Sequence, residues 1–324
     1  MIGKHHVIIE TSGLKYSFEI RRNITIIQGN SATGKTMLIE LLSDYKRRGP
    51  GQGITVTSDV PVYVYTGDGS NWKYELDGVK GSLVFIDEEY SFVFTKEFAG
   101  FLAGSDNYYI FITRKPLYEL PYSTQEIYGI RTSGKYHFPE QICHEFYPLY
   151  PGSAFTATEK RIMILVEDKE AGYQFYKNIV GEERCISAEG NSTLYSKMIE
   201  ADADHGLLII ADGAAFGPHV EKVKKYADLK GHMALYFPES FEWMILKSGI
   251  LHDTSINEIL THPEDYVDSR EYISWERFFT ALLQEKTEGD PVKRYSKSRL
   301  SAFYTGENAK NILQVMPEEI RELM

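Results

Sequence analysis

The chain has 324 residues, 43% hydrophobic and 25% charged, a composition typical of a folded globular protein with room for about two domains. Its formal net charge is −11, and the excess of acid lies in the second half, where 29 Asp and Glu face 20 Lys and Arg. This argues against a broad nucleic-acid-binding surface. The absence of a long apolar run predicts no membrane contact. Cys143 and Cys185 have no metal-ligand spacing, which predicts a cytoplasmic protein with reduced thiols.

The first predicted elements are strands at residues 6–10, 14–20 and 24–27, where apolar and β-branched residues predominate. The third strand leads into Gly29-Asn30-Ser31-Ala32-Thr33-Gly34-Lys35-Thr36, which matches the P-loop pattern G-x-x-x-x-G-K-[ST] at every fixed position. The two glycines allow a tight turn that brings backbone N–H groups onto phosphate oxygens. Lys35 suits the β- and γ-phosphates of a nucleotide, and the Thr36 hydroxyl suits Mg²⁺. The structural alternative is an ordinary glycine-rich turn.

A helix is predicted from residue 37, and strand-like segments follow at 60–65, 73–76, 82–87 and 108–113. The segment at 82–87 ends in Asp87 and Glu88, the pattern of a Walker B strand. There Asp87 would hold the Mg²⁺ shell and Glu88 would orient or deprotonate the attacking water. A strand that merely ends in acids is the alternative. The next strand ends at Thr113 and Arg114, where a side chain can sense a γ-phosphate.

The absence of two motifs narrows the choice of nucleotide and of P-loop protein class. No Asn-Lys-x-Asp motif follows the P-loop to read guanine, so ATP is expected rather than GTP. No Leu-Ser-Gly-Gly-Gln signature is present either. Residues 1–135 therefore resemble a compact P-loop ATPase of AAA-like or reduced ABC-like type, which implies ATP and Mg²⁺ as cofactors.

The Pro- and Gly-containing stretch at 147–153 predicts a domain boundary, and a second α/β pattern begins after it. Strands are predicted at 161–166, 184–187, 206–211 and 233–237, and helices at 171–180, 193–201 and 219–229. This alternation favours a parallel sheet covered on both faces. We thus predict an α/β chain with a P-loop NTPase domain over 1–148 and a second doubly wound domain over 155–324, whose last ~75 residues are mostly helical.

Acidic residues end the predicted strands of the second domain. The run Ile162-Met163-Ile164-Leu165-Val166-Glu167-Asp168, followed by a helix, resembles the opening of a Toprim domain, as found in topoisomerases, primases and OLD-type nucleases. In that family the first strand ends in a Glu, here Glu167, and a later strand ends in a metal-binding Asp-x-Asp. Asp212 matches the first of these acids, but Ala214 occupies the place of the second.

The strand that ends at Pro238-Glu239 is similar to a segment of the Toprim-like DUF4435 proteins, some of which work beside P-loop ATPases in bacterial anti-phage systems. The resemblance implies that Glu167, Asp212 and Glu239 (or Glu242) converge on Mg²⁺ for phosphodiester cleavage. Three interpretations remain open: an active one-metal or rearranged nuclease, a degenerate Toprim-like scaffold that binds a partner, and an unrelated domain with incidental acids.

The combined prediction is an ATPase that regulates a metal-dependent, nucleic-acid-processing domain in phage defence or on a mobile element. DNA, RNA, a protein partner or a second copy of the chain are the partners this implies. The rivals are an ATP-dependent switch with a catalytically degenerate second domain, and a P-loop kinase. The basic run at residues 293–299 reads either as a solvated helix face or as a phosphate-contacting patch.

Overall fold

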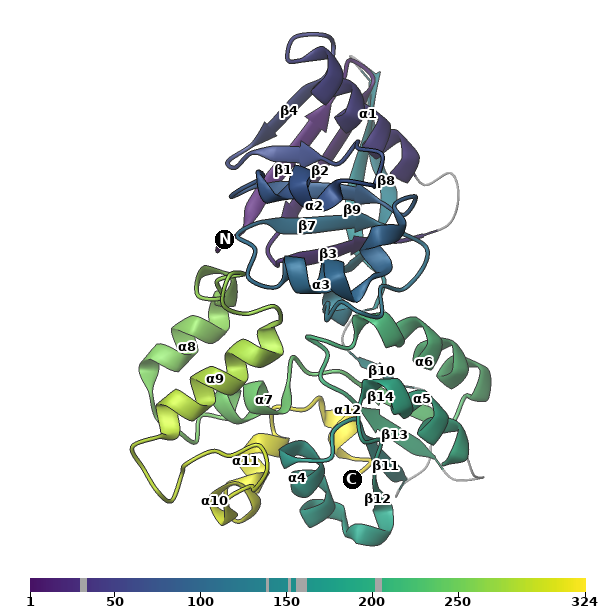
Figure 1. Cartoon of the computed structure of the whole chain (residues 1–324). Helices are drawn as coiled ribbons and strands as arrows, with labels where there is room; N and C mark the ends of the chain where they lie inside the picture. The colour runs from purple at the N-terminus through teal and green to yellow at the C-terminus, as the bar shows by residue number, and fades with distance from the viewer. Residues whose placement is uncertain (30–33, 138–139, 151–152, 156–161, 202–205) are drawn as a thin grey trace. The chain divides into compact units, whose positions relative to one another are not determined.

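Figure 1 presents the computed structural model, which describes residues 1–29, 34–137, 140–150, 153–155, 162–201 and 206–324. The chain has a mixed α/β fold and divides into two compact units. The first unit comprises Met1–Leu149 together with His262–Ser274, and the second comprises Tyr150–Thr261 together with Trp275–Met324. Each unit is built around its own sheet.

The first unit has a large mixed sheet in the order β4-β1-β2-β9-β8-β3-β7-β6-β5. The five strands from β8 to β5 run parallel to one another, whereas β8 and β9 form a long antiparallel pair. The strands β1, β2 and β4 extend the sheet on the other side. The bounds are β1 (His5–Glu10), β2 (Leu14–Ile20), β3 (Ile24–Ile27), β4 (Thr55–Ser58), β5 (Val62–Val64), β6 (Leu83–Asp87), β7 (Tyr108–Ile112), β8 (Ile127–His137) and β9 (Glu140–Pro148).

The helices of the first unit bury one apolar stripe each. Leu38 and Leu42, four residues apart on α1, are buried in the same core cluster as strand residues such as Phe85 and Ile110. The basic residues of the last turn of α1 suit the negative end of the helix dipole. The helical elements are α1 (Lys35–Arg48), α2 (Trp72–Asp77), η1 (Ser91–Phe94), α3 (Lys96–Leu102), η2 (Thr124–Glu126) and η4 (Pro263–Asp265).

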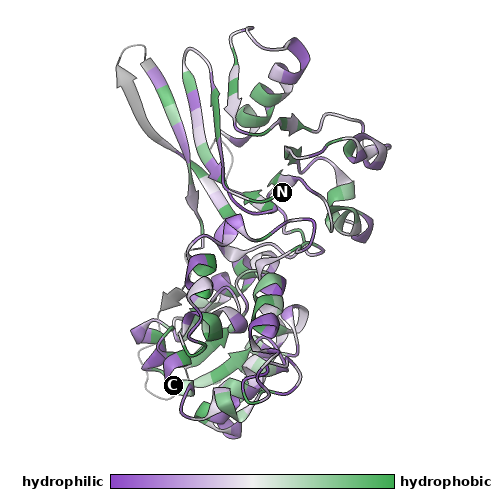
Figure 2. Ribbon diagram, turned by 90° about the vertical axis from the view of Figure 1, so that its left-hand side faces the viewer, coloured by the Kyte–Doolittle hydropathy of each residue, from purple (hydrophilic) through white to green (hydrophobic). Residues whose placement is uncertain are grey.

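The second unit has a sheet in the order β10-β14-β13-β11-β12, in which β14, β13, β11 and β12 are parallel and β10 is antiparallel. Every residue of β13 and β14 is buried. Green, hydrophobic strands cross the unit that contains the C-terminus in the hydropathy view of Figure 2. Such continuous apolar strands are expected where helices cover both faces of a sheet. The strand bounds are β10 (Ser153–Phe155), β11 (Met163–Val166), β12 (Cys185–Ser187), β13 (Leu207–Ile210) and β14 (Met233–Tyr236).

Helices connect these parallel strands and continue to the end of the chain. The α6 helix begins with a proline in its first turn and ends at Gly231 in the left-handed region, the usual start and stop signals. The helical elements are α4 (Ala171–Val180), η3 (Glu182–Arg184), α5 (Asn191–Glu200), α6 (Gly217–Lys230), α7 (Phe241–Lys247), α8 (Thr254–Thr261), α9 (Trp275–Thr287), α10 (Ala302–Thr305), α11 (Ala309–Leu313) and α12 (Glu318–Arg321).

One predicted strand is wrong. Residues 73–76 belong to the helix α2, in which Trp72 and Leu76 are buried four residues apart, the spacing of one helix face. Trp72 packs against Phe92 with ring centroids 5.0 Å apart, so tertiary packing outweighs the strand-like composition of this short segment. Within the described residues, no helix has both the length and the apolar character needed to cross a membrane.

Candidate functional site

The P-loop sequence lies between β3 and α1 in the first unit. Residues Asn30, Ser31, Ala32 and Thr33 lie outside the described residues, whereas Gly29, Gly34, Lys35 and Thr36 lie within them. Gly34 precedes α1 with φ 93°, a left-handed conformation that favours glycine. A Cβ there would also approach the Tyr16 hydroxyl at 2.9 Å. Tyr16, a residue of β2, donates a hydrogen bond of 2.7 Å to the Gly34 carbonyl, so β2 helps to fix the start of α1.

Lys35 is the first residue of α1, and its side chain reaches back to Gly29. Its ammonium group donates to the Gly29 carbonyl at 2.6 Å, and the residue is only 7% exposed. Burial lowers the pKa of Lys35, the positive charge of Arg114 lowers it further, and Glu88 opposes both. Lys35, Arg114 and Glu88 therefore lie close enough for their charges to act on one another. Thr36 follows on the exposed side of α1.

The Walker B candidates lie where β6 ends. Because β3, β7 and β6 are parallel, their carboxyl ends share one edge of the sheet, which is where ligands bind in such sheets. Asp87 ends β6, half-buried, and its carboxylate accepts the Glu88 backbone N–H at 2.6 Å. Burial raises the pKa of Asp87, and the nearby Glu89 and Glu88 carboxylates add to the effect.

Arg114 contacts Glu88. The Arg114 backbone N–H donates to the Glu88 carboxylate at 2.6 Å, and its guanidinium Nε lies 3.6 Å from the other carboxylate oxygen. The side chain of Arg114 is 58% exposed, so the guanidinium is only loosely held there. The predicted general base is therefore ion-paired with the predicted phosphate sensor in this arrangement.

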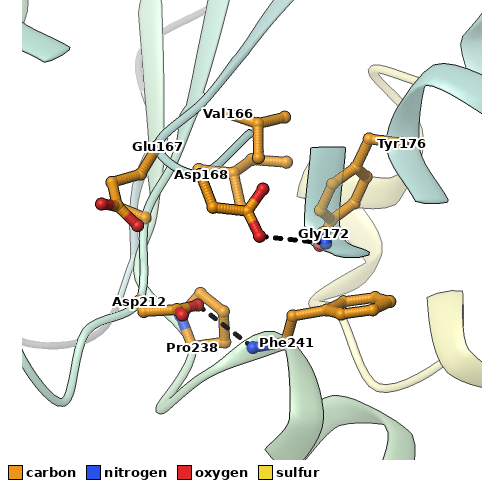
Figure 3. A pocket seen from close by; sticks show the side chains of 10 residues that line it. Val166, Glu167, Asp168, Gly172, Tyr176, Asp212, Pro238 and Phe241 are labelled. Carbon is orange, nitrogen blue, oxygen red and sulfur yellow. Dashed lines mark hydrogen bonds between the residues drawn. The ribbon is translucent and has the colours of Figure 1, made fainter. Parts of the chain in front are cut away.

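The second group of candidate residues lies at the ends of β11 and β13 in the second unit. Figure 3 shows Glu167 and Asp212 at neighbouring strand ends, on the same side of a small cavity. The cavity measures about 10 Å³, room for one water-sized sphere. Among the described residues that line it are Asp168, Tyr176 and Phe241, while Glu239 does not line it.

Each strand-end carboxylate accepts a hydrogen bond from the start of a helix. The Asp168 carboxylate accepts the N–H groups of Gly172 at 3.1 Å and Tyr173 at 2.7 Å, at the start of α4. Asp212 accepts the Phe241 N–H at 3.1 Å, at the start of α7. Glu167 accepts the Asn191 N–H at the start of α5. Helix N-termini favour negative charge, so these bonds both orient the acids and partly compensate for their burial.

The carboxylates nevertheless raise one another's pKa. Burial raises the pKa of Glu167 to about 7, and the Glu276 and Asp168 charges contribute in the same direction. Burial also raises the pKa of Asp212 well above its ordinary value, reinforced by Glu276, Glu242 and Glu167. Two half-buried acids with raised pKa values at adjacent strand ends are a recognised feature of functional sites.

Sequence reasoning missed part of this cluster. Glu276 and Lys297 belong to it, although they lie far along the chain, and their side chains form an ion pair at 2.9 Å. Glu242, considered as an alternative to Glu239, is 1% exposed and accepts a 2.6 Å hydrogen bond from the Tyr295 hydroxyl. The basic run at 293–299 was the only signal that pointed toward Lys297.

Ala214 and Glu239 occupy a different part of the same edge. The Ala214 N–H donates to the Glu239 carbonyl at 3.0 Å, and Ala214 is 2% exposed. The adjacent Gly213 donates to the Pro238 carbonyl at 2.6 Å. These bonds join the loops that follow β13 and β14. Considering only residues whose positions the structure describes, no three His, Cys, Asp or Glu side chains are arranged so that they could hold a metal ion.

Comparisons with known proteins give no family for this chain. No family model matches it, and neither the curated proteins nor the solved structures contain a significant match.

Proposed function

We propose that the first unit binds and hydrolyses ATP with Mg²⁺. The observation that carries this proposal is the arrangement around Lys35: a left-handed Gly34 opens the helix, the lysine folds onto Gly29, and the loop carries the full P-loop sequence. Asp87, Glu88 and Arg114 complete the neighbourhood. A helix N-terminus with a lysine beside it is a ready-made site for phosphate.

In this proposal Lys35 binds the β- and γ-phosphates, while Thr36 and Asp87 hold Mg²⁺, which supplies charge neutralisation to the transferred phosphoryl group. Glu88 orients the attacking water and accepts its proton. The exposed guanidinium of Arg114 exchanges its partner, Glu88, for the γ-phosphate. This exchange frees one oxygen of the Glu88 carboxylate, Oε1, when nucleotide is bound.

We further propose that ATP in the first unit controls Mg²⁺-dependent cleavage of DNA or RNA by the second unit, in phage defence or on a mobile element. Glu167, Asp212 and Glu242 are the residues that would hold the metal. One oxygen of Glu242, Oε2, is buried and has no hydrogen-bond partner among the described residues, so the site has an unused ligand atom. Carboxylate oxygens are the ligands that Mg²⁺ prefers.

A second candidate is an ATP-dependent switch whose second unit binds a partner without cleaving it. Two observations favour it. Ala214 supplies no carboxylate at the second strand-end position, and Lys297 already lies among the acids as an internal cation. The two candidates share the ATPase and differ only in whether a divalent metal acts at the second unit.

The ATPase is tested by calorimetric titration with a non-hydrolysable ATP analogue and by phosphate release with Mg²⁺. Lys35→Ala is expected to weaken binding by roughly tenfold or more, because a buried phosphate-facing charge is lost. The matched control is Lys73→Ala, which removes an exposed lysine of the same unit. Absence of binding by the wild type, or equal binding by Lys35→Ala, would refute the proposal.

The second unit is tested with Asp212→Asn, and with Asp228→Asn as a control because Asp228 is an exposed acid on α6 that pairs with Lys224. Metal-dependent cleavage lost only in Asp212→Asn supports the nuclease. If no preparation cleaves nucleic acid while ATP is still hydrolysed, the switch replaces it.

A further inference from the structure

Lys297 is held in place by the segment that carries it. On one side of it, Tyr295 is buried, its hydroxyl donates to Glu242 at 2.6 Å, and its N–H donates to Thr287 at 3.0 Å. On the other side, Gln174 of α4 donates to the Ser298 carbonyl at 2.9 Å and accepts the Leu300 N–H at 3.0 Å. Because the segment is hydrogen-bonded on both sides of Lys297, the backbone position of the lysine is fixed.

The Lys297 ammonium group contacts one carboxylate and acts electrostatically on four others. It donates to Glu276 at 2.9 Å, and only 32% of the side chain is exposed. Its charge also acts on Asp212, Glu167, Asp168 and Glu242, in each case lowering a pKa that burial raises. Burial alone would lower the pKa of Lys297, but the charges of Glu276, Glu242 and Asp212 outweigh it and raise that pKa.

An ordinary surface ion pair does not account for this arrangement. Exposed pairs involve one acid and contribute little to stability. Here the ammonium group contacts one acid and its charge lowers the pKa of four others, and the five come from four different segments of the chain: Glu276, and then Glu167, Asp168, Asp212 and Glu242. Buried charges are expected to be paired with an opposite charge. In the described part of the second unit, Lys297 supplies that positive charge to the acids of the cluster.

The cluster also contains an unused ligand atom. Glu242 directs Oε1 to the Tyr295 hydroxyl, while its buried Oε2 has no partner among the residues that the structure describes. A buried carboxylate oxygen without a partner is costly unless a cation or water completes it. The lysine therefore compensates only part of the negative charge of the site.

We infer that the Lys297 ammonium group is the resident cation of the carboxylate cluster and that a divalent metal ion binds there only by displacing it. This inference rests on the proposed function of the second unit, because it specifies how that site takes its metal. The lysine competes with the metal for the acids and so lowers their affinity for it. It thereby explains why the metal-free chain holds carboxylates in one place without a preformed set of three ligands in its described part.

The test is Mn²⁺ titration of the nucleotide-free full chain, followed by electron paramagnetic resonance of free Mn²⁺. Lys297→Met is expected to bind Mn²⁺ at the cluster roughly tenfold more tightly than the wild type, because a competing charge is removed. Lys293→Met is the matched control, since Lys293 lies in the same segment but pairs with Asp290. The Asp212→Asn variant identifies which binding belongs to the cluster.

A second measurement needs no variant. Acylation of lysine amines, read by mass spectrometry, should label Lys297 faster when Mn²⁺ is added, while Lys293 labelling stays constant. Unchanged Lys297 labelling on saturation with Mn²⁺ overturns the inference, as does equal or weaker Mn²⁺ binding by Lys297→Met.

The failures are distinguishable. If wild-type binding depends on Asp212 but is insensitive to Lys297, the inference is wrong and the metal-dependent function stands. If no Mn²⁺ binding depends on Asp212 in any variant, both are wrong.

Discussion

Replacing Glu167 by glutamine is expected to stabilise the metal-free protein at pH 8 and to leave its stability nearly unchanged at pH 4.5. The folded-state pKa of this carboxyl is about 7, against an ordinary value of 4.5. Between these values the folded state binds more protons than the unfolded state, so stability falls as the pH rises through this window. Glutamine keeps the oxygen that accepts the Asn191 N–H but cannot acquire the charge.

The magnitude follows from the width of the window. Each unit of pKa shift corresponds to about 1.4 kcal/mol, so ionisation of Glu167 costs about 3 kcal/mol at pH 8. For a unit of this size, each kcal/mol of unfolding free energy shifts the melting temperature by roughly 2–4 °C. At pH 4.5 the carboxyl is largely protonated in the folded state, and little of the difference remains.

The assay is thermal and urea unfolding of the full chain in EDTA at pH 4.5 and pH 8, followed by circular dichroism. Glu258→Gln is the control, because Glu258 is an exposed acid on α8. A Glu167→Gln protein that is no more stable than the wild type at pH 8, or is stabilised equally at both pH values, would show that folding does not raise the pKa of this carboxyl.

Three further predictions concern single positions. Gly213→Ala should destabilise the protein by about 1–3 kcal/mol in urea unfolding, because a Cβ would lie 2.7 Å from the Phe237 carbonyl, whereas Gly289→Ala, with open space around it, should be neutral. Glu88→Gln should keep ATP binding but slow phosphate release by about 100-fold or more, and an unaltered rate would remove Glu88 from the proposed mechanism. Asp168→Ala should cost about 1 kcal/mol, since it deprives the start of α4 of two hydrogen bonds, and equal stability would contradict that capping role.

The sequence predicted the elements that carry local signals. The P-loop glycines, the apolar run before Asp87 and the strand–helix alternation of the second unit are all contained in short windows, and the predicted strands at β3, β6, β11 and β13 are confirmed. In contrast, the pair β8 and β9 was not predicted, because polar and turn-forming residues interrupt its apolar pattern.

Long-range packing could not be predicted from such windows. Residues 262–274 return to the first unit, where Asn23 donates to the Ile273 carbonyl at 2.7 Å, an interaction between residues with no shared sequence pattern. The same limit explains the second site. Glu167 and Asp212 follow recognisable strands, whereas Glu276 and Lys297 join them through tertiary packing of the helical C-terminal region.

The central claim, that ATP at the first unit controls metal-dependent cleavage at the second, is tested most directly by nicking of supercoiled plasmid DNA and cleavage of tRNA. The assay compares wild type, Lys35→Ala and Glu167→Ala with Mg²⁺ or Mn²⁺, with and without ATP. The account predicts cleavage that Glu167→Ala abolishes and that ATP alters in the wild type but not in Lys35→Ala. Cleavage that persists in Glu167→Ala, that ignores ATP, or that is absent under every condition would contradict it.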